Sequence, residues 1–418
     1  MLITFNVKNF MSFRDATTLS LESEPITEHE DTHTFEHQET KLLKTAVIYG
    51  ANASGKSNLL KAMKVMRDLI LNSSKESTAT EGINVTPFLL NTHSANEPTI
   101  FEIEFIHKDL IYRYGFSVDK KKVHEEWLYL KELKLFDRKG NKYDLPKSSP
   151  FHNEGKGLQA KTRDNALFLS VVANFNGKIA LDIQSWIEDF KFISGMDNRS
   201  MNQIGDLLDK PSYKEKILKL IRAADIGIED LKVEEIEYTF GDSVLPKNFK
   251  GQILYSVRKT FNEEEQEAGL QTFDVRLSES EGTKKFLALV GPIIEILENG
   301  GVLLVDELDA KLHPHLTRKI VEMFNSYDVN KSNAQLIYAT HDVTNLTNKQ
   351  FRRDQLWFVE KDRIGSSELF SLADFRDVDD KKIRKDASYA KDYMLGKYGA
   401  IPKFHSWKRA LEDNNGES

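Results

Sequence analysis

Eight consecutive residues, Gly50 to Ser57, fit the phosphate-binding pattern G-x-x-x-x-G-K-[ST] at every fixed position. Glycines at 50 and 55 let the backbone turn so that successive N–H groups point at an anion. The positive end of a following helix would add to that anion site. We expect Lys56 to reach the β- and γ-phosphates and the Ser57 hydroxyl to hold Mg²⁺. This Walker A loop predicts binding of ATP or GTP.

The elements predicted on either side of the loop follow in the order that the motif requires. Residues 45–49 form a short apolar run rich in β-forming residues, and residues 58–66 carry apolar side chains at helical spacing. The loop therefore lies where a buried strand passes into a helix. The predicted nucleotide contacts of this stretch are Gly50, Asn52, Ala53, Ser54, Gly55, Lys56, Ser57 and Asn58.

A second motif, Asp306-Glu307, follows the apolar run 302–305, which predicts a short buried strand. Two carboxylates at the end of such a strand can divide two tasks, since one can hold Mg²⁺ while the next takes a proton from the attacking water. We assign Asp306 to the metal and Glu307 to the general base. Alone, the pattern also fits a core strand that runs into a polar turn, but beside a Walker A loop it indicates a Walker B strand.

A third predicted strand, residues 335–339, ends at Thr340-His341. Ligands of open α/β sheets bind outside the carboxyl ends of the strands, so we expect His341 to contact the γ-phosphate or the attacking water. The predicted catalytic residues are thus Lys56, Glu307 and His341. A metal site formed by His313, His315 and His341 is the alternative, but a turn after the Walker B acids explains Pro314 without a metal.

The composition indicates a globular chain, since 40% of its 418 residues are hydrophobic. The longest apolar runs fall short of the roughly 20 residues that a membrane span needs, and the first residues predict a strand and not a signal peptide. No cysteine is present, which excludes disulfides and thiolate chemistry. We expect a cytoplasmic protein. The net charge of −7 means that nucleic-acid binding would need a local basic patch or a partner.

The N-terminal part of the chain has strand-like patterns. Residues 2–20 alternate apolar and polar side chains around the turn-like stretch 9–14, which predicts a pair of strands. In the polar segment 21–40, His29, His33 and His37 are spaced by four, so they could line up as metal ligands on a helix. The interleaved threonine and aspartate residues favour a solvated loop instead.

Patterns along the rest of the chain alternate between β and α character. Strands forming an antiparallel meander are predicted over residues 99–105, 110–116 and 123–136. Helical spacing follows at residues 167–172, 179–192 and 213–224, and strand-like runs return at 228–240 and 252–261. We therefore expect an N-terminal ATPase lobe with Walker A (1–150), a mostly helical insertion (151–225), a C-terminal ATPase lobe with Walker B and His341 (226–375) and a tail (376–418).

These motifs together resemble the ATP-binding-cassette (ABC) type ATPases of the SMC/RecF/OLD branch over nearly the whole chain. The resemblance rests on the opening strand with Asn9-Phe10-x-Ser12-Phe13, on the Walker A form G-A-N-A-S-G-K-S-N, and on the run from Asp306 to Pro314. It implies an α/β fold: a P-loop ABC-type ATPase head with a mixed β-sheet core, an antiparallel β subdomain and a mostly helical insertion. It also implies ATP and Mg²⁺ as cofactors.

Residues 280–284, Ser-Glu-Gly-Thr-Lys, resemble the signature motif of that branch, with Thr283 in place of the glutamine of the transporter form. In such ATPases the signature serine and glycine of one subunit close over the γ-phosphate bound by the other. The resemblance thus gives Ser280 and Gly282 a role across a head-to-head dimer, makes Asp309 the D-loop aspartate and His341 the switch histidine, and leaves the Q-loop residue unassigned. Read without it, residues 280–283 are a helix N-cap with an acidic first turn.

The chain is also similar to the RloA and AbiL-type abortive-infection ATPases of bacteria, in residues 223–228, 353–361 and 393–402. That similarity implies antiphage defence with a separately encoded effector, often a nuclease. OLD-type relatives carry a C-terminal nuclease domain, which needs on the order of a hundred residues. Only residues 342–418 follow His341, and the pair Asp377 and Asp379 lies in Lys-rich surroundings typical of a solvated turn. We expect any nuclease on another chain.

Three functions stay open from the sequence. The first is an ATPase switch, in which a homodimer or higher even oligomer sandwiches two nucleotides and controls an effector such as a nuclease. The second is a RecF-like repair ATPase that contacts nucleic acid directly or through its partner. The third is a nucleotide-stabilised scaffold with little turnover, which Glu307 argues against. A transporter subunit fits least, because the signature and the insertion both depart from that pattern, and we expect no membrane partner.

Overall fold

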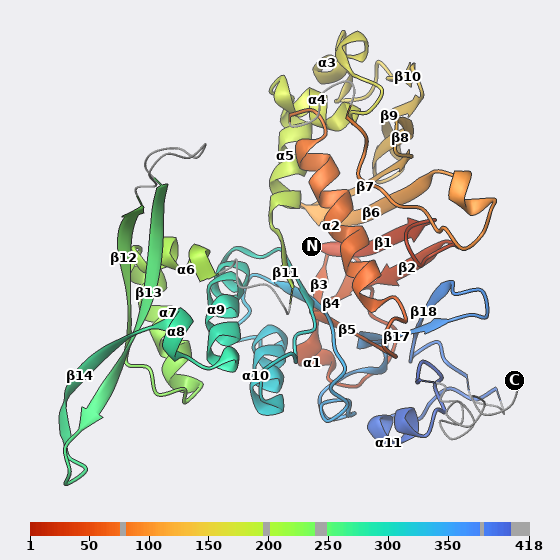
Figure 1. Cartoon of the computed structure of the whole chain (residues 1–418). Coiled ribbons are helices and arrows are strands. Elements are labelled where there is room, and N and C mark those ends of the chain that lie inside the picture. Colours follow the sequence, from red (N-terminus) through yellow and green to blue (C-terminus); the bar gives the residue numbers. More distant parts are fainter. Residues whose placement is uncertain (76–80, 195–200, 239–248, 377–379, 403–418) are drawn as a thin grey trace, which may run out of the picture.

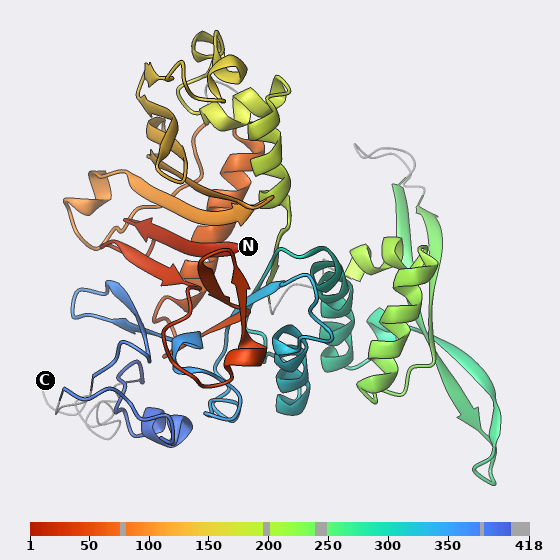
Figure 2. The ribbon, with the colours of Figure 1, turned by 180° about the vertical axis from the view of Figure 1, so that it is seen from behind.

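A computed structural model describes residues 1–75, 81–194, 201–238, 249–376 and 380–402 of the chain (Figures 1 and 2). Two large sheets and the helix α2 (Lys56–Asn72) contribute side chains to one hydrophobic core. In this core Phe5 of the first sheet, Ile337 of the second and Met63 of the helix are all buried. The chain therefore has the predicted α/β class, with helix α2 packed on strands of the second sheet.

The first sheet is antiparallel, in the order β10-β9-β8-β7-β6-β1-β2. Its strands are β1 (Leu2–Lys8), β2 (Thr17–Ser20), β6 (Thr99–His107), β7 (Leu110–Val118), β8 (Val123–Leu130), β9 (Leu133–Lys139) and β10 (Lys142–Asp144). The predicted pair at 2–20 and the predicted meander are confirmed. The run 123–136 is two strands and not one, because the chain reverses at Lys131, whose φ is 50°.

The second sheet has the order β11-β15-β16-β5-β17-β18 and is parallel except for its last strand. Its strands are β5 (Thr45–Gly50), β11 (Phe190–Ser194), β15 (Val302–Asp306), β16 (Gln335–Ala339), β17 (Leu356–Lys361) and β18 (Ser367–Ser371). The three strands predicted to carry the motifs are confirmed. The helical prediction for residues 179–192 is wrong at its end, because α5 (Lys178–Glu188) stops and β11 pairs with β15.

A third, three-stranded sheet projects to one side of the molecule with three helices (Figures 1 and 2). It consists of β12 (Asp230–Tyr238), β13 (Phe249–Phe261) and β14 (Glu267–Asp274), and the helices are α6 (Met201–Leu208), α7 (Pro211–Ala223) and α8 (Val275–Ser278). Both views place α9 (Glu281–Asn299) and α10 (Pro314–Asn325) between this arm and the parallel sheet. The sequence did not predict β14, whose residues 267–272 are all exposed.

Short elements complete the described chain. They are α1 (Glu30–His33), β3 (Thr34–His37), β4 (Thr40–Leu43), α3 (His152–Gly155), α4 (Phe168–Asn174), α11 (Tyr389–Met394) and the 3-10 helices η1 (Ser94–Asn96), η2 (Gln159–Lys161) and η3 (Arg353–Gln355). No helix in the described ranges is both long enough and apolar enough to cross a membrane. The pair Asp377 and Asp379, considered above for nuclease chemistry, lies outside the described residues.

The solvated loop predicted over residues 21–40 is wrong for residues 30–37, which form α1 and β3. His33 is buried there, its Nδ1 lies 2.8 Å from Gln355 Oε1, and its ring stacks on that of His29 at 4.6 Å. Nowhere in the described part of the chain do three His, Cys, Asp or Glu side chains gather as a metal site would require. The metal alternatives for both histidine groups therefore find no support in the structure.

Gln335, at the start of β16, ties the two large sheets together. Its Oε1 accepts a hydrogen bond from Leu2 N at 2.6 Å, and its Nε2 donates to the carbonyl oxygens of Leu2 and Leu43 at 3.0 and 3.1 Å. All three side-chain bonds are buried, so the amide satisfies backbone groups that water cannot reach.

We expect Gln335→Leu to lower the free energy of unfolding by about 3 kcal/mol, because one donor and two acceptors stay buried without partners. Urea denaturation followed by circular dichroism measures this change. The exposed Gln271 of β14 offers a matched control, and Gln271→Leu should change the free energy by less than about 0.5 kcal/mol. Equal stability of the two variants would contradict the bridging role of Gln335.

Candidate nucleotide site

The Walker A loop runs from the end of β5 into α2, and it passes between neighbours that leave no room for a side chain. A Cβ on Gly50 would lie 2.5 Å from Val359 O. A Cβ on Gly55, whose φ is 120°, would lie 2.3 Å from Ser367 Oγ and 2.8 Å from Ser12 Oγ. Glycine is therefore required at both positions for the loop to keep this path.

Lys56, the first residue of α2, points back into the loop. Its Nζ donates hydrogen bonds to the carbonyl oxygens of Gly50 at 2.9 Å and Ala51 at 3.1 Å. Burial of this ammonium group lowers the pKa of Lys56 to about 8, and the nearby carboxylates of Asp306 and Glu307 act in the opposite direction. The cation is thus held against the loop backbone, beside the N-terminal end of α2 where an anion is favoured.

Two segments distant in sequence support the second half of the loop. Asn58 Nδ2 donates to Ser12 Oγ at 2.9 Å, which joins the turn after β1 to the first turn of α2. Ser367 N donates to Ser12 O at 2.7 Å, and the Ser367 hydroxyl donates to Ser54 O. The resemblance pointed to Ser12, whereas no local pattern in the sequence marks Ser367.

The two predicted metal ligands lie together. Ser57 Oγ donates a hydrogen bond to Asp306 Oδ1 at 3.0 Å, so a hydroxyl and a carboxylate oxygen meet at the carboxyl ends of β5 and β15. Mg²⁺ prefers oxygen ligands and is often bound by one or two protein groups together with substrate phosphates. The donor set of Ser57 and Asp306 fits that preference, and these two residues would hold the ion.

Glu307, Asp309 and His341 also meet at this edge of the sheet. His341 N lies 3.4 and 3.3 Å from Asp309 Oδ1 and Oδ2, and Leu308 N donates to Ala339 O at 3.1 Å. Glu307 adopts a left-handed backbone conformation, with φ at 54°, directly after β15. These contacts join the turns that follow β15 and β16, and the carboxylates of Asp309, Glu307 and Asp306 lie near enough to His341 to act on its pKa.

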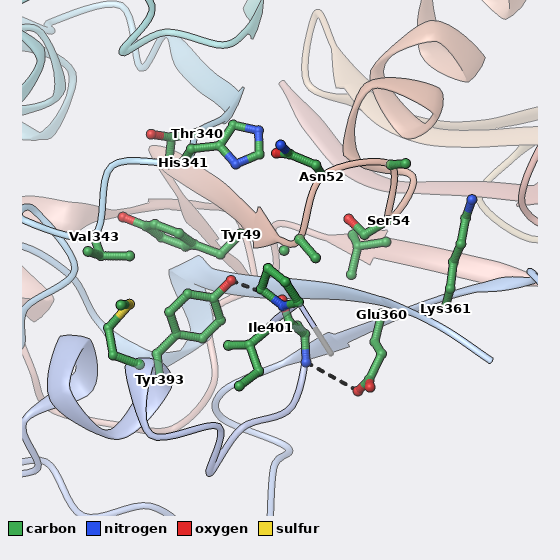
Figure 3. A pocket seen from close by; sticks show the side chains of 17 residues that line it. Tyr49, Asn52, Ser54, Thr340, His341, Val343, Glu360, Lys361, Tyr393 and Ile401 are labelled. Atoms are coloured by element: carbon green, nitrogen blue, oxygen red, sulfur yellow. Dashed lines mark hydrogen bonds between the residues drawn. The ribbon is translucent and has the colours of Figure 1, made fainter. Parts of the chain in front are cut away.

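A cavity of about 880 Å³ opens beside the first half of the loop (Figure 3). The side chains of Asn52 and His341 point toward each other across its rim, and Tyr49 and Tyr393 lie below them. Partial burial, followed by the charge of Lys56, lowers the pKa of His341, which favours the neutral imidazole. A neutral ring at this rim can accept or donate a hydrogen bond beside the predicted phosphate site.

The residues predicted to form the signature lie at the start of α9 and contact the predicted D-loop of their own chain. Ser280 is the N-cap, since its Oγ accepts a hydrogen bond from Thr283 N at 3.1 Å. A Cβ on Gly282 would lie 2.7 Å from Lys311 O, and Lys311 Nζ contacts Glu281 Oε2 at 2.8 Å. The described residues include no hydrogen bond from Ser280 or Gly282 to the Walker A loop. The cap predicted from the residues is confirmed, but it did not foresee the close packing at Gly282.

Lys285, one turn into α9, is a residue that the sequence did not single out. Its side chain is only 3% exposed, and among the described residues its Nζ has no hydrogen-bond partner. Burial lowers the pKa of Lys285 to about 8, while the carboxylates of Glu307 and Asp309 act in the opposite direction. A lysine in a polar stretch ordinarily indicates a solvated position, so no pattern in the sequence could have revealed this buried one.

Comparison with known proteins gives a family and two structural likenesses. Residues 46–348 match the family model described as "AAA domain, putative AbiEii toxin, Type IV TA system". The SMC head bound to the C-winged helix domain of ScpA is 13% identical, with a TM-score of 0.42 over 88% of this chain and 97% of that one. The SMC head domain from Thermotoga maritima is 12% identical, with a TM-score of 0.41 over 88% and 98%. Among curated proteins no sequence matches.

We expect Lys56→Ala to weaken binding of an ATP analogue by about 10-fold to 100-fold, because a hydrogen bond to a charged group is worth about 1.5–3 kcal/mol. Isothermal titration with a non-hydrolysable analogue and Mg²⁺ measures the change. Lys61→Ala, which removes an exposed cation from the same helix, is the control and should bind as the wild type does. If Lys56→Ala binds the analogue with wild-type affinity, the assignment of the phosphate site to this loop is contradicted.

Proposed function

The chain belongs to this AAA domain family, and on that premise we propose that it is a Mg²⁺-dependent ATP hydrolase that works as a head-to-head dimer. One observation carries the proposal: a 3.0 Å bond between Ser57 and Asp306 joins the Walker A and Walker B motifs at one edge of the parallel sheet, where Glu307 and His341 also lie. A loop, a metal-binding pair and a general base in this arrangement support phosphoryl transfer to water.

Each residue at this edge has a separate task in the proposed reaction. The Lys56 ammonium binds the β- and γ-phosphates, and Glu307 accepts the proton of the attacking water, for which a carboxylate has lone pairs to offer. His341 orients the water or the γ-phosphate from the rim that it shares with Asn52. When bound by Ser57 and Asp306, Mg²⁺ neutralises charge that develops on the phosphate oxygens.

The position of the predicted signature residues supports the proposed dimer. Ser280 caps the N-terminus of a 19-residue helix, which favours anions, and it is exposed at the surface. In the described residues the hydrogen bonds of its side chain go to Thr283 alone and not to its own Walker A loop. A γ-phosphate on a second copy is a ligand that fits this end of the helix, and the resemblance to ABC-type ATPases favours the same arrangement.

We propose further that the dimer controls a separately encoded effector, such as a nuclease, in bacterial antiphage defence. The similarity to RloA and AbiL-type ATPases in residues 223–228, 353–361 and 393–402 supports this, as does the toxin–antitoxin description of the matching family. Pull-down of the product of the adjacent gene, with and without ATP, tests the partnership. ATP-dependent binding would support it, and lack of binding in both states would contradict it.

Glu307→Gln should bind ATP and Mg²⁺ but hydrolyse ATP about 10²–10⁴-fold more slowly, because the amide keeps the shape of the carboxylate and cannot take a proton. The ATP-bound dimer should therefore accumulate, which sedimentation velocity detects. Glu264→Gln in the exposed turn after β13 is the control and should hydrolyse ATP at the wild-type rate. A steady-state rate of Glu307→Gln equal to that of the wild type would place the base on another residue.

The role of the signature motif across the dimer is best tested at Ser280, since any side chain at Gly282 must displace Lys311 O within the same chain. Ser280→Asp should fold normally, because aspartate is as good an N-cap as serine, but its charge should repel the partner's γ-phosphate. We expect it to bind ATP without dimerising or hydrolysing it, whereas the neutral cap of Ser280→Asn should retain dimer formation.

Mixing Ser280→Asp with Lys56→Ala sharpens this test. The mixed dimer has one composite site in which the intact Walker A loop of one chain meets the intact signature of the other. Part of the ATPase activity should return on mixing two inactive proteins, as a coupled phosphate-release assay would show. Full activity of Ser280→Asp alone would confine the signature residues to a structural role.

A further inference from the structure

We propose that the C-terminal segment 389–402 positions the His341 loop through Tyr393 and Tyr49, which makes the two tyrosines positioning residues for ATP hydrolysis. The inference rests on the proposed hydrolase function. It concerns a segment that neither the Walker motifs nor the family match at residues 46–348 includes.

The segment is fixed to the parallel sheet by its own hydrogen bonds. Tyr393 of α11 donates its hydroxyl to Ala400 O at 3.0 Å, and Ala400 N donates to Glu360 Oε2 of β17 at 3.2 Å (Figure 3). Gly396, Gly399 and Ala400 have φ values of 75°, 66° and 56°, so the chain turns back sharply after α11. Because Ala400 is bonded both to Glu360 of β17 and to the Tyr393 hydroxyl, it fixes Tyr393 relative to the sheet.

Aromatic side chains connect this segment to the strand that leads into the Walker A loop. The ring of Tyr393 lies 6.0 Å from that of Tyr49 and 5.3 Å from that of Phe358, measured between centroids. Tyr49 directly precedes Gly50, the first residue of the loop, and is 1% exposed. Rings packed at these distances fix each other's orientation, and such pairs contribute stability beyond their buried area.

Tyr49 in turn holds the backbone next to His341. Its hydroxyl donates a hydrogen bond to Asp342 O at 3.2 Å, while Asp342 N donates to Thr340 Oγ1 at 2.9 Å. The peptide between Asp342 and Val343, one residue beyond His341, is therefore bonded to the strand that carries the loop. A buried hydroxyl without an acceptor costs free energy. Conformations of the His341 loop that keep Asp342 O within reach of Tyr49 are therefore favoured.

These contacts form one path from the C-terminal segment to the phosphate site. The ring of Tyr393 packs against that of Tyr49, and the hydroxyl of Tyr49 donates to the backbone of Asp342. The side chain of His341 then faces Asn52 across the cavity rim. Neither tyrosine is expected to touch the phosphates. Both lie below Asn52 and His341, the two residues at the rim of the cavity beside the loop (Figure 3). Their loss should therefore change the rate of the chemical step while the affinity for nucleotide stays the same.

The test compares three variants in steady-state ATPase assays. Tyr49→Phe keeps the ring and removes the hydrogen bond to Asp342. Tyr393→Leu keeps an apolar side chain and removes the ring that packs against Tyr49. Both should lower kcat by about fivefold with KM and analogue affinity unchanged, as expected for loss of one hydrogen bond that positions a catalytic group. Tyr398→Phe removes another hydroxyl of the segment, bonded to Asp392 Oδ2 at 3.3 Å, and should match the wild type.

The outcomes separate this inference from the function on which it rests. If the wild type itself hydrolyses no ATP, the proposed function fails. If the wild type is active and Tyr49→Phe has the same kcat, the inference alone is overturned. A reduced kcat for Tyr49→Phe with wild-type kcat for Tyr393→Leu would overturn the part assigned to the C-terminal segment. A rise in KM equal to the fall in kcat, or a lowered melting temperature that accounts for lost activity, would also count against positioning.

Discussion

The hydrogen bond between Ser57 and Asp306 joins two motifs that lie 249 residues apart in the sequence. It can form only because β5 and β15 run parallel in one sheet, with β16 between them, so that all three strands end at the same edge. The start of α2, the Walker B acids and the His341 loop therefore meet at one edge because of this strand order. Parallel strands need long crossover connections, and the strands β6–β10 lie in the connection from β5 to β11, while the arm of β12–β14 lies in that from β11 to β15.

Close packing around the Walker A loop is the second constraint. Val359 O lies against Gly50, and the hydroxyls of Ser12 and Ser367 lie against Gly55, so the loop is enclosed by segments from both ends of the chain. A similar contact recurs at Gly282, where α9 meets the backbone of Lys311. The start of α9 and the backbone at Lys311 are thus in direct contact within one chain, so motion of one would displace the other.

Local patterns in the sequence predicted those structural features that depend on a few adjacent residues. The strands of Walker A, Walker B and His341 are apolar runs between polar turns, and the cap at Ser280 is a property of a few adjacent residues. The strand β11 was missed because a short apolar run after a helix does not reveal by periodicity that the helix has ended. Contacts of Tyr49, Ser367 and Lys285 join distant segments, and one sequence carries no local signal for them.

We propose that two chains share each nucleotide site, and this sharing can be tested by the dependence of the wild-type ATPase rate on chain concentration. If Ser280 of one copy completes the site of another, the rate per chain should rise with concentration and then level off as the dimer saturates. A rate per chain that stays constant down to concentrations at which sedimentation detects only monomers would contradict the shared site.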